Sequence, residues 1–155
     1  MNEKMINELN NSKDQLALLT TLFAEREIGI HDLINQDAIG LKILPSVLNK
    51  FAVALTNNKN GLIVKPENSH QLFLTAATQG DARACRNVGL NFLQGRGVER
   101  NLFEAIHWLK KASNLLKENF DSPYLLGMAC LEHEEKINAK LFFRQALRHP
   151  KNSDK

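Results

Sequence analysis

Small and large apolar residues recur along this chain with a spacing of 34 to 36 residues. A separation of 36 places Gly61, Ser69, Leu72, Phe73, Ala76 and Ala77 over Gly97, Ala105, Trp108, Leu109, Ala112 and Ser113. A separation of 34 places Ala105, Trp108, Leu109 and Ala112 over Ala139, Phe142, Phe143 and Ala146. A period of this length that contains two helices is typical of an α-solenoid, in which each helical hairpin packs its apolar face on the next.

The first helices of the last two repeats also align, because Val88-Gly89 falls on Leu126-Gly127 at a separation of 38. Small residues such as Ala105 and Ala112 let helices approach closely, and Trp108 is expected to fill the space between helix pairs. The sequence therefore predicts an all-α protein: a right-handed α–α solenoid of about three two-helix repeats, preceded by N-terminal capping helices.

Apolar residues recur every three or four positions along most of the chain, which favours helices over strands. Ser12 and Gln15 have the spacing of a capping box for a first helix over about 13–26. Asp32 is suited to cap a second helix, which Pro45 ends. The remaining predicted helices cover 46–56, 66–80, 81–94, a segment capped by Asn101, a segment starting at Ser122-Pro123, and about 136–148.

The composition is that of a globular protein, with 155 residues, 43% hydrophobic and 24% charged, which excludes disordered and fibrous classes. The net charge of +3 is too small for a dedicated nucleic-acid binder. We expect a helical cap over residues 1–44, a solenoid over 45–149 and a disordered tail over 150–155.

The segment "GDARACRNVGLNFLQGRGVERNLFEAIHWLKKAS", residues 80–113, resembles a Sel-one-like repeat (SLR), a close relative of the tetratricopeptide repeat. The family pattern is met here by Ala84, Val88-Gly89, Phe92, Gly95-Arg96-Gly97-Val98, Ala105, Trp108 and Ala112. The flanking segments, roughly 45–79 and 118–149, are degenerate: the first lacks the Leu-Gly pair and the last lacks the Gly-x-Gly-Val loop. Residues 1–44 match no part of the pattern.

This resemblance implies a bacterial adaptor-type protein that binds another protein without catalysis, as an adaptor, a chaperone or an immunity protein. A self-associating structural module is the first alternative and a hydrolase the less favoured one. Some relatives described as β-lactam hydrolases carry paired cysteines in each repeat, and this sequence lacks them.

The loop "QGRGVERN", residues 94–101, raises the possibility of a phosphate site, because glycine-rich loops that lead into helices often bind phosphate. A phosphate loop usually follows a strand, whereas a predicted helix precedes Gly95. We therefore predict a turn, with Gly95 in a left-handed cap and Gly97 in a tight reversal. Arg96 and Arg100 are then interpreted as solvated loop charges.

No catalytic or metal-binding constellation emerges from the sequence. The histidines His31, His70, His107, His133 and His149 lie on different segments without ligand spacing, so neither a metal nor a cofactor is expected. Cys85 and Cys130 are interpreted as packed, reduced thiols. The polar N-terminus lacks a signal-peptide apolar region, and no segment approaches the ~18 apolar residues of a membrane span. We expect a cytoplasmic protein that binds neither nucleic acid nor membranes.

Partner binding is predicted on a concave groove that holds a peptide or helix of another protein. Arg83, Asn87, Asn91 and Gln94 share one side of a helix and are suited to hydrogen-bond a peptide backbone or carboxylate. Phe51 and Leu55, one repeat earlier, would form an apolar strip beside them. The alternative is that the N-terminal helices cover Phe51 and Leu55 and that the polar side is only solvated.

Two further surfaces carry predictions. Lys136, Lys140, Arg144 and Arg148 recur every four residues, which indicates a solubilising face on the last helix or a docking stripe for an acidic partner. The apolar stripe of Leu16, Leu19, Leu22 and Phe23 must be buried, either on the first repeat or against a second chain. The protein is therefore predicted to be a monomer or a homodimer.

Overall fold

The computed structural model describes residues 2–58, 61–116 and 121–148, and it is all-α as predicted. These ranges contain nine α-helices and one short 3-10 helix, and no strand. The chain divides into two compact units, Met1–Asp81 and Ala82–Lys155, which we call the first and the second unit. The predicted boundary at residue 44 falls inside the first unit, and the predicted tail over 150–155 lies outside the described residues.

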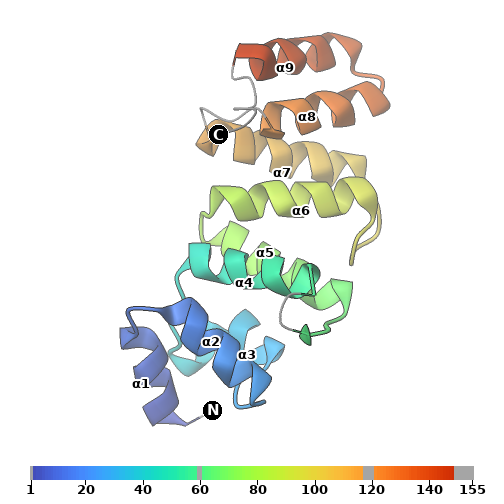
Figure 1. The fold of residues 1–155 in the computed structure, drawn as a ribbon. Coiled ribbons are helices and arrows are strands. Elements are labelled where there is room, and N and C mark those ends of the chain that lie inside the picture. Colours follow the sequence, from blue (N-terminus) through green and yellow to red (C-terminus); the bar gives the residue numbers. More distant parts are fainter. Residues whose placement is uncertain (1, 59–60, 117–120, 149–155) are drawn as a thin grey trace. The chain divides into compact units, whose positions relative to one another are not determined.

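The first unit is built from six helical segments (Figure 1). They are α1 (Glu3–Asn11), α2 (Gln15–Ala24), α3 (Ile30–Ile34), the 3-10 helix η1 (Gln36–Ile39), α4 (Pro45–Thr56) and α5 (Pro66–Thr78). Helix α4 packs against α5, while α2 lies against α4 and α3 against α5. The N-terminal helices therefore share one core with the helices that the sequence assigned to the first repeat.

The start of the chain differs from the prediction. Ser12 does not begin the helix over 13–26; it ends α1, and Asp14 caps α2 by accepting a hydrogen bond from the Ala17 N–H at 3.0 Å. The helix predicted from Asp32 to Pro45 is also shorter, because it ends in η1 and Gly40 adopts a left-handed φ of 72°. An extended segment then leads into α4.

Two buried glutamine amides hold that extended segment in place. The Gln15 Nε2 group donates to the Lys42 carbonyl at 2.8 Å, and Gln15 Oε1 accepts from the Leu44 N–H at 3.0 Å. Gln36 Oε1 accepts from the Ile43 N–H at 3.0 Å. Side chains thus satisfy backbone groups that a helix would otherwise have paired, which is why the chain stays extended there.

The second unit contains two helical hairpins (Figure 1). They are α6 (Ala82–Gln94) with α7 (Leu102–Leu115), and α8 (Asp121–Glu132) with α9 (Lys136–Arg148). Each helix packs on the next one in sequence, and α6 also contacts α8. The core between the hairpins consists of Leu109, Leu126, Ala129, Cys130 and Ala139. This pairing confirms the prediction of consecutive two-helix repeats.

A glycine marks the closest helix contact in each hairpin. A Cβ atom added at Gly89 would lie 2.7 Å from Leu109 Cγ, and one added at Gly127 would lie 2.8 Å from Phe143 Cδ1. The repeat alignment relates these two pairs to each other, since Gly89 corresponds to Gly127 and Leu109 to Phe143. The glycine of the Leu-Gly position is therefore required for close packing of the hairpin, because a large side chain of the second helix fills the space above it.

Candidate functional site

The loop over 95–101 is a turn, as predicted. Gly95 and Gly97 have left-handed φ values of 67° and 68°, and the Arg96 N–H donates to the Asn91 carbonyl at 3.0 Å. Asn101 then caps α7 by accepting from the Glu104 N–H at 3.1 Å. The glycines serve the reversal between two helices, and the amides of the turn close back on α6.

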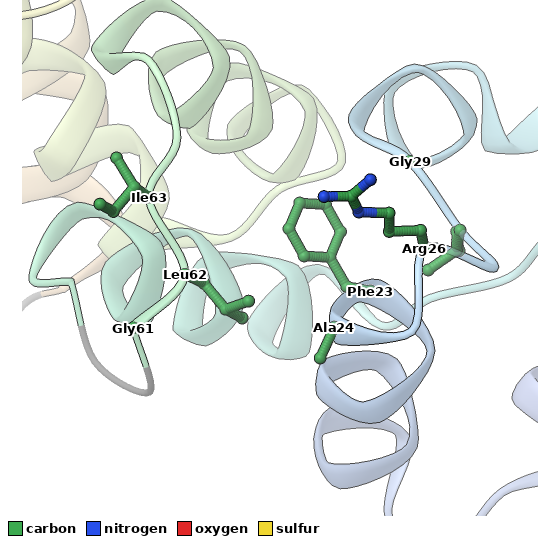
Figure 2. A pocket seen from close by; sticks show the side chains of 8 residues that line it. Phe23, Ala24, Arg26, Gly29, Gly61, Leu62 and Ile63 are labelled. Atoms are coloured by element: carbon green, nitrogen blue, oxygen red, sulfur yellow. The ribbon is translucent and has the colours of Figure 1, made fainter.

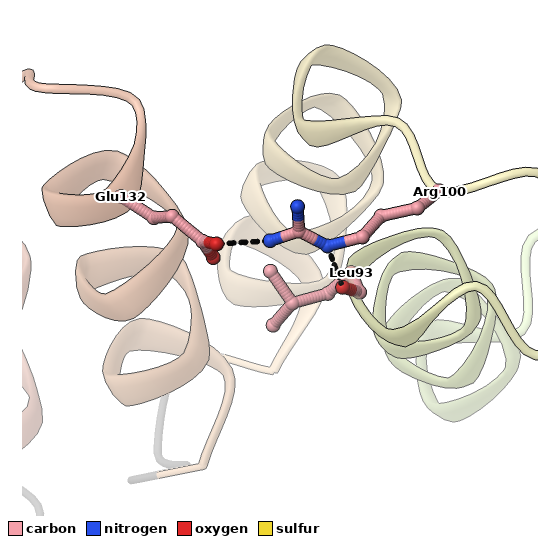
Figure 3. A network of polar contacts seen from close by, with 3 residues as sticks. All are labelled: Leu93, Arg100 and Glu132. Carbon is pink, nitrogen blue, oxygen red and sulfur yellow. Dashed lines mark hydrogen bonds and ion pairs between the residues drawn. The ribbon is translucent and has the colours of Figure 1, made fainter.

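Arg100 is not the solvated loop charge that the sequence suggested. Its Nε group donates to the Leu93 carbonyl at 2.9 Å, and its guanidinium pairs with the Glu132 carboxylate at the end of α8 (Figure 3). Arg86 of α6 forms a second ion pair with Asp121 at the start of α8, with 3.2 Å between Nη2 and Oδ2. Arginines from the first hairpin thus contact both ends of α8. Arg96 is exposed, in agreement with its prediction.

Phe51 and Leu55 do not form an apolar surface strip. They are 1% and 3% exposed and lie in the core of the first unit. The ring of Phe23 in α2 packs edge-on against Phe51, with 5.3 Å between centroids. The prediction of an open strip is therefore wrong at these two positions, because the N-terminal helices cover them.

The polar side of α6 is only partly on the surface. Arg83 and Gln94 are exposed, Asn87 is half-buried, and Asn91 is 6% exposed. Asn91 is three residues after the buried Val88, so it shares the buried side of the helix. The six predicted groove residues belong to two different compact units, and of these six only Arg83 and Gln94 have exposed side chains.

The apolar stripe of α2 is buried within the first unit. Leu19 and Leu22 belong to its core, while Leu16 and Phe23 are half-buried. Since α2 packs on α4, the stripe has its partner in the same chain. This packing corresponds to the first of the two predicted alternatives and leaves no role for a second chain at Leu19 and Leu22.

The outer surface of α9 carries more than the predicted basic stripe. Lys136, Lys140, Arg144 and Arg148 are all exposed, and no acidic residue occurs between 136 and 148. Ile137 and Leu147 are also exposed, at 80% and 75%, together with Leu141. A helix whose outer face served only solubility would not expose these side chains. The predicted polar face of α9 is therefore present, but exposed apolar residues that the sequence analysis did not predict lie on the same helix.

Helix α8 adds a second exposed apolar stripe that sequence reasoning missed. Tyr124, Met128 and Leu131 follow at spacings of four and three, so they share one side of the helix. Each is between 42% and 48% exposed. We define the end surface as these three residues with three exposed residues on one side of α9, the helix that packs on α8: Tyr124, Met128, Leu131, Lys140, Arg144 and Leu147. The repeat alignment could have revealed this surface, because it relates these positions to residues of the preceding hairpin. The regular spacing of the basic residues in α9 drew the interpretation toward charge alone.

A pocket in the first unit lies beside the end of α2 (Figure 2). Phe23, Leu62 and Ile63 supply apolar side chains, and Arg26, with a left-handed φ of 62°, supplies the one ionisable group among its lining residues. General acid–base catalysis requires a side chain that gains or loses a proton near neutral pH, and the guanidinium of arginine stays protonated. The described lining residues of this pocket therefore offer no general acid or base.

The buried titratable groups of the described residues include two cysteines and one histidine. Cys85 and Cys130 are buried and form no disulfide, and burial raises the pKa of the Cys130 thiol. His70 is buried in α5, where burial lowers the pKa of its imidazole. No group of three His, Cys, Asp or Glu side chains with metal-binding geometry occurs in residues 2–58, 61–116 and 121–148.

The helical hairpins, their period and their glycine contacts define a helical-repeat protein of the tetratricopeptide-like class. Residues 82–115 match the Sel1 repeat family, and this is the segment whose sequence pattern resembled such a repeat. The matched span covers α6, the glycine loop and α7. Sel1 repeats typically mediate protein interactions, and the match indicates no catalytic family.

The fold is similar to that in the crystal structure of a Sel1 repeat protein from Oxalobacter formigenes, with a TM-score of 0.63 and 24% sequence identity. The similarity covers 97% of this chain and 57% of that protein, so the chain spans little more than half of its length. No curated protein matches the chain. Among the helices of the described residues, none has the length and apolar character that crossing a membrane requires.

Proposed function

We propose that this protein is a non-catalytic interaction module that binds another protein through its second unit. The observation that supports this proposal is the end surface, where Tyr124, Met128 and Leu131 of α8 leave about half of their area in contact with water. Exposed apolar side chains that gather on one face mark interaction sites more often than single ones do. The Sel1 repeat in the same unit agrees with an interaction function.

The hydrophobic effect would supply most of the free energy with which the end surface binds a partner. Covering apolar surface contributes about 25 cal/mol for each Å² removed from water, and a few large side chains at the centre of an interface supply most of the affinity. Helices α8 and α9 are held by the core of the second unit. They therefore present these side chains in fixed positions, which lowers the entropic cost of binding.

The polar side of α6 remains part of the proposal, without the buried Asn91. Arg83 and Gln94, with the half-buried Asn87 between them, are suited to contact the backbone or a carboxylate of a bound peptide. Adaptor, chaperone and immunity roles share this mechanism. The thiols of Cys85 and Cys130, which are not joined in a disulfide, support a reducing compartment such as the cytoplasm.

Affinity purification from extracts of the cells that make the protein tests this function. The wild type is compared with Met128→Glu plus Leu131→Glu, with Arg83→Ala plus Gln94→Ala, and with Ile63→Glu as a control. Ile63 is an exposed apolar residue of the first unit, so it receives the same kind of chemical change outside the end surface.

We expect a protein that the wild type and Ile63→Glu retain and that Met128→Glu plus Leu131→Glu loses. If that partner is lost only from the α6 variant, binding uses the polar side of α6 instead of the end surface. If no protein is retained by the wild type above the background of an unrelated helical protein, the interaction function itself is wrong.

A further inference from the structure

We infer that the end surface receives an amphipathic helix with acidic side chains, supplied by a partner protein; this inference rests on the interaction function proposed above. It follows from the way in which the second unit already packs one of its own helices. Helix α8 lies on the hairpin formed by α6 and α7, and the same receiving surface recurs one repeat later without an occupant among the described residues.

The internal interface shows which chemistry such a surface accepts. Leu93 of α6 and Ile106 of α7 pack on the core to which α8 contributes Leu126, Ala129 and Cys130. Asp121 in the first turn of α8 pairs with Arg86, and Glu132 at its last residue pairs with Arg100. The helix that this repeat receives is therefore apolar along its centre and acidic at both ends.

The repeat alignment transfers the position of this receiving surface onto α8 and α9, where Tyr124 stands in place of the cation Arg86. A shift of 38 residues relates Arg86, Leu90 and Leu93 of α6 to Tyr124, Met128 and Leu131 of α8. A shift of 34 residues relates Ile106 and Lys110 of α7 to Lys140 and Arg144 of α9. Arg86, Leu93 and Ile106 contact α8 or its core, and their counterparts Tyr124, Leu131 and Lys140 are exposed.

The charge of α9 selects an acidic occupant. It carries four exposed cations and no carboxylate, and the ion pairs of the described residues include none of the four. The carboxylates of Asp121 and Glu132 in α8 already pair with Arg86 and Arg100, and Glu135, just before α9, pairs with His133. An incoming helix with glutamates along its flank gains attraction from Lys140 and Arg144, while a basic helix is repelled.

Binding of designed helical peptides tests this inference. The probe is a stapled helical peptide with leucines at the spacing of Leu125, Leu126, Ala129 and Cys130 and glutamates on the flank and at both ends. A matched peptide carries lysine in place of every glutamate. Fluorescence anisotropy measures the affinity of each peptide for the wild type and for Lys140→Glu plus Arg144→Glu. The control variant Lys50→Glu plus Lys65→Glu makes the same charge change on exposed lysines of the first unit.

We expect the wild type and the control variant to bind the glutamate peptide at least about tenfold more tightly than the lysine peptide. The Lys140→Glu plus Arg144→Glu protein is expected to reverse that preference, and Met128→Glu to weaken both peptides. The affinity for the glutamate peptide should fall as the salt concentration rises, because the charges are exposed. Circular dichroism of each variant confirms that it folds.

Equal binding of the two peptides, or no binding of the glutamate peptide at about millimolar concentration, overturns the acidic helix. Light scattering that shows a dimer lost in Lys140→Glu plus Arg144→Glu also overturns it, because a second copy then covers the surface. The two proposals fail separately. If extract partners depend on Met128 and Leu131 but the glutamate peptide does not bind, the interaction function stands and only the acidic helix is wrong.

Discussion

Gly89 of α6 lies directly against Leu109 of α7, so that an added Cβ atom would meet Leu109 Cγ at 2.7 Å and the Leu109 backbone nitrogen at 3.1 Å. The corresponding contact in the next hairpin is softer. A Cβ atom at Gly127 meets only the ring of Phe143 within 3.1 Å, and a ring can turn aside more readily than a backbone can move. The two equivalent glycines therefore differ in what a methyl group would displace.

Gly89→Ala is expected to destabilise the second unit more than Gly127→Ala does. Overpacking a helix contact costs about 1–3 kcal/mol, which exceeds the ~1 kcal/mol that alanine gains over glycine inside a helix. Urea unfolding followed by circular dichroism measures both. Met128→Ala, at an exposed position of α8, provides the control. A Gly89→Ala protein as stable as the wild type would show that α6 and α7 are less closely packed than described.

Arg100→Ala is expected to destabilise the protein more than Glu132→Gln. Arg100 loses its hydrogen bond to the Leu93 carbonyl as well as its ion pair, whereas Glu132→Gln removes only the charge of the pair. Exposed ion pairs contribute about 0–1 kcal/mol, so the Glu132→Gln effect should be small and should vanish at high salt. A double-mutant cycle in urea isolates the coupling. A coupling of zero at low salt would contradict the pairing.

The free energy of unfolding is expected to fall as the pH drops below about 6.5, in part because of His70. Burial lowers the pKa of this imidazole in the folded state, so the unfolded chain binds a proton at a higher pH than the folded one. His70 therefore stabilises the fold less as the pH falls through that window. One such group accounts for at most about 1.4 kcal/mol per pH unit.

Urea unfolding between pH 7.5 and 5 should show a shallower pH dependence in His70→Gln than in the wild type. His107→Gln changes an exposed histidine and serves as the control. If the pH dependence of the unfolding free energy is the same in His70→Gln as in the wild type, the buried imidazole does not contribute to that dependence.

Cys130 is expected to react slowly with thiol reagents in the folded protein. Burial raises the pKa of its thiol, with a further increase from Glu135 that Lys110 partly offsets, so little thiolate is present at neutral pH. Labelling of the Cys85→Ala protein should become fast only when urea unfolds it. Rapid labelling under native conditions would contradict the burial of Cys130 between α8 and its neighbours.

The helices of the second unit could be predicted from the sequence, because the signals that start and end them are local. Asn101 caps α7 as predicted, and Gly95 ends α6 in the left-handed conformation that only glycine adopts freely. The period of the small and large residues then fixes which helix packs on which. In this unit the predicted starts of the four helices and the predicted ends of α6 and α9 lie within about two residues of the observed ones, the uncertainty usual at helix ends.

The first unit could not be predicted in the same way, since its structure depends on contacts between residues far apart in the sequence. Phe51 and Leu55 have the helical spacing of an exposed strip, and only the presence of α2 over α4 decides that they are buried. The pairing of Arg100 with Glu132 likewise joins residues 32 positions apart, which no local pattern indicates. The end surface could have been predicted from the repeat alignment. It was not, because the regular spacing of the basic residues in α9 favoured an interpretation in terms of solubility.

The buried amide of Gln15 joins three segments at once, through the Leu9 carbonyl, the Lys42 carbonyl and the Leu44 N–H. One side chain thereby links α1, α2 and the entry to α4. Helices of the second unit are joined almost wholly to their neighbours, so a hairpin there can be duplicated or deleted during evolution with the rest of the packing intact. An insertion between Gly40 and Leu44 would instead shift the Lys42 carbonyl or the Leu44 N–H away from this amide. The protein should therefore tolerate the gain or loss of a hairpin in the second unit better than an insertion into this short segment of the first.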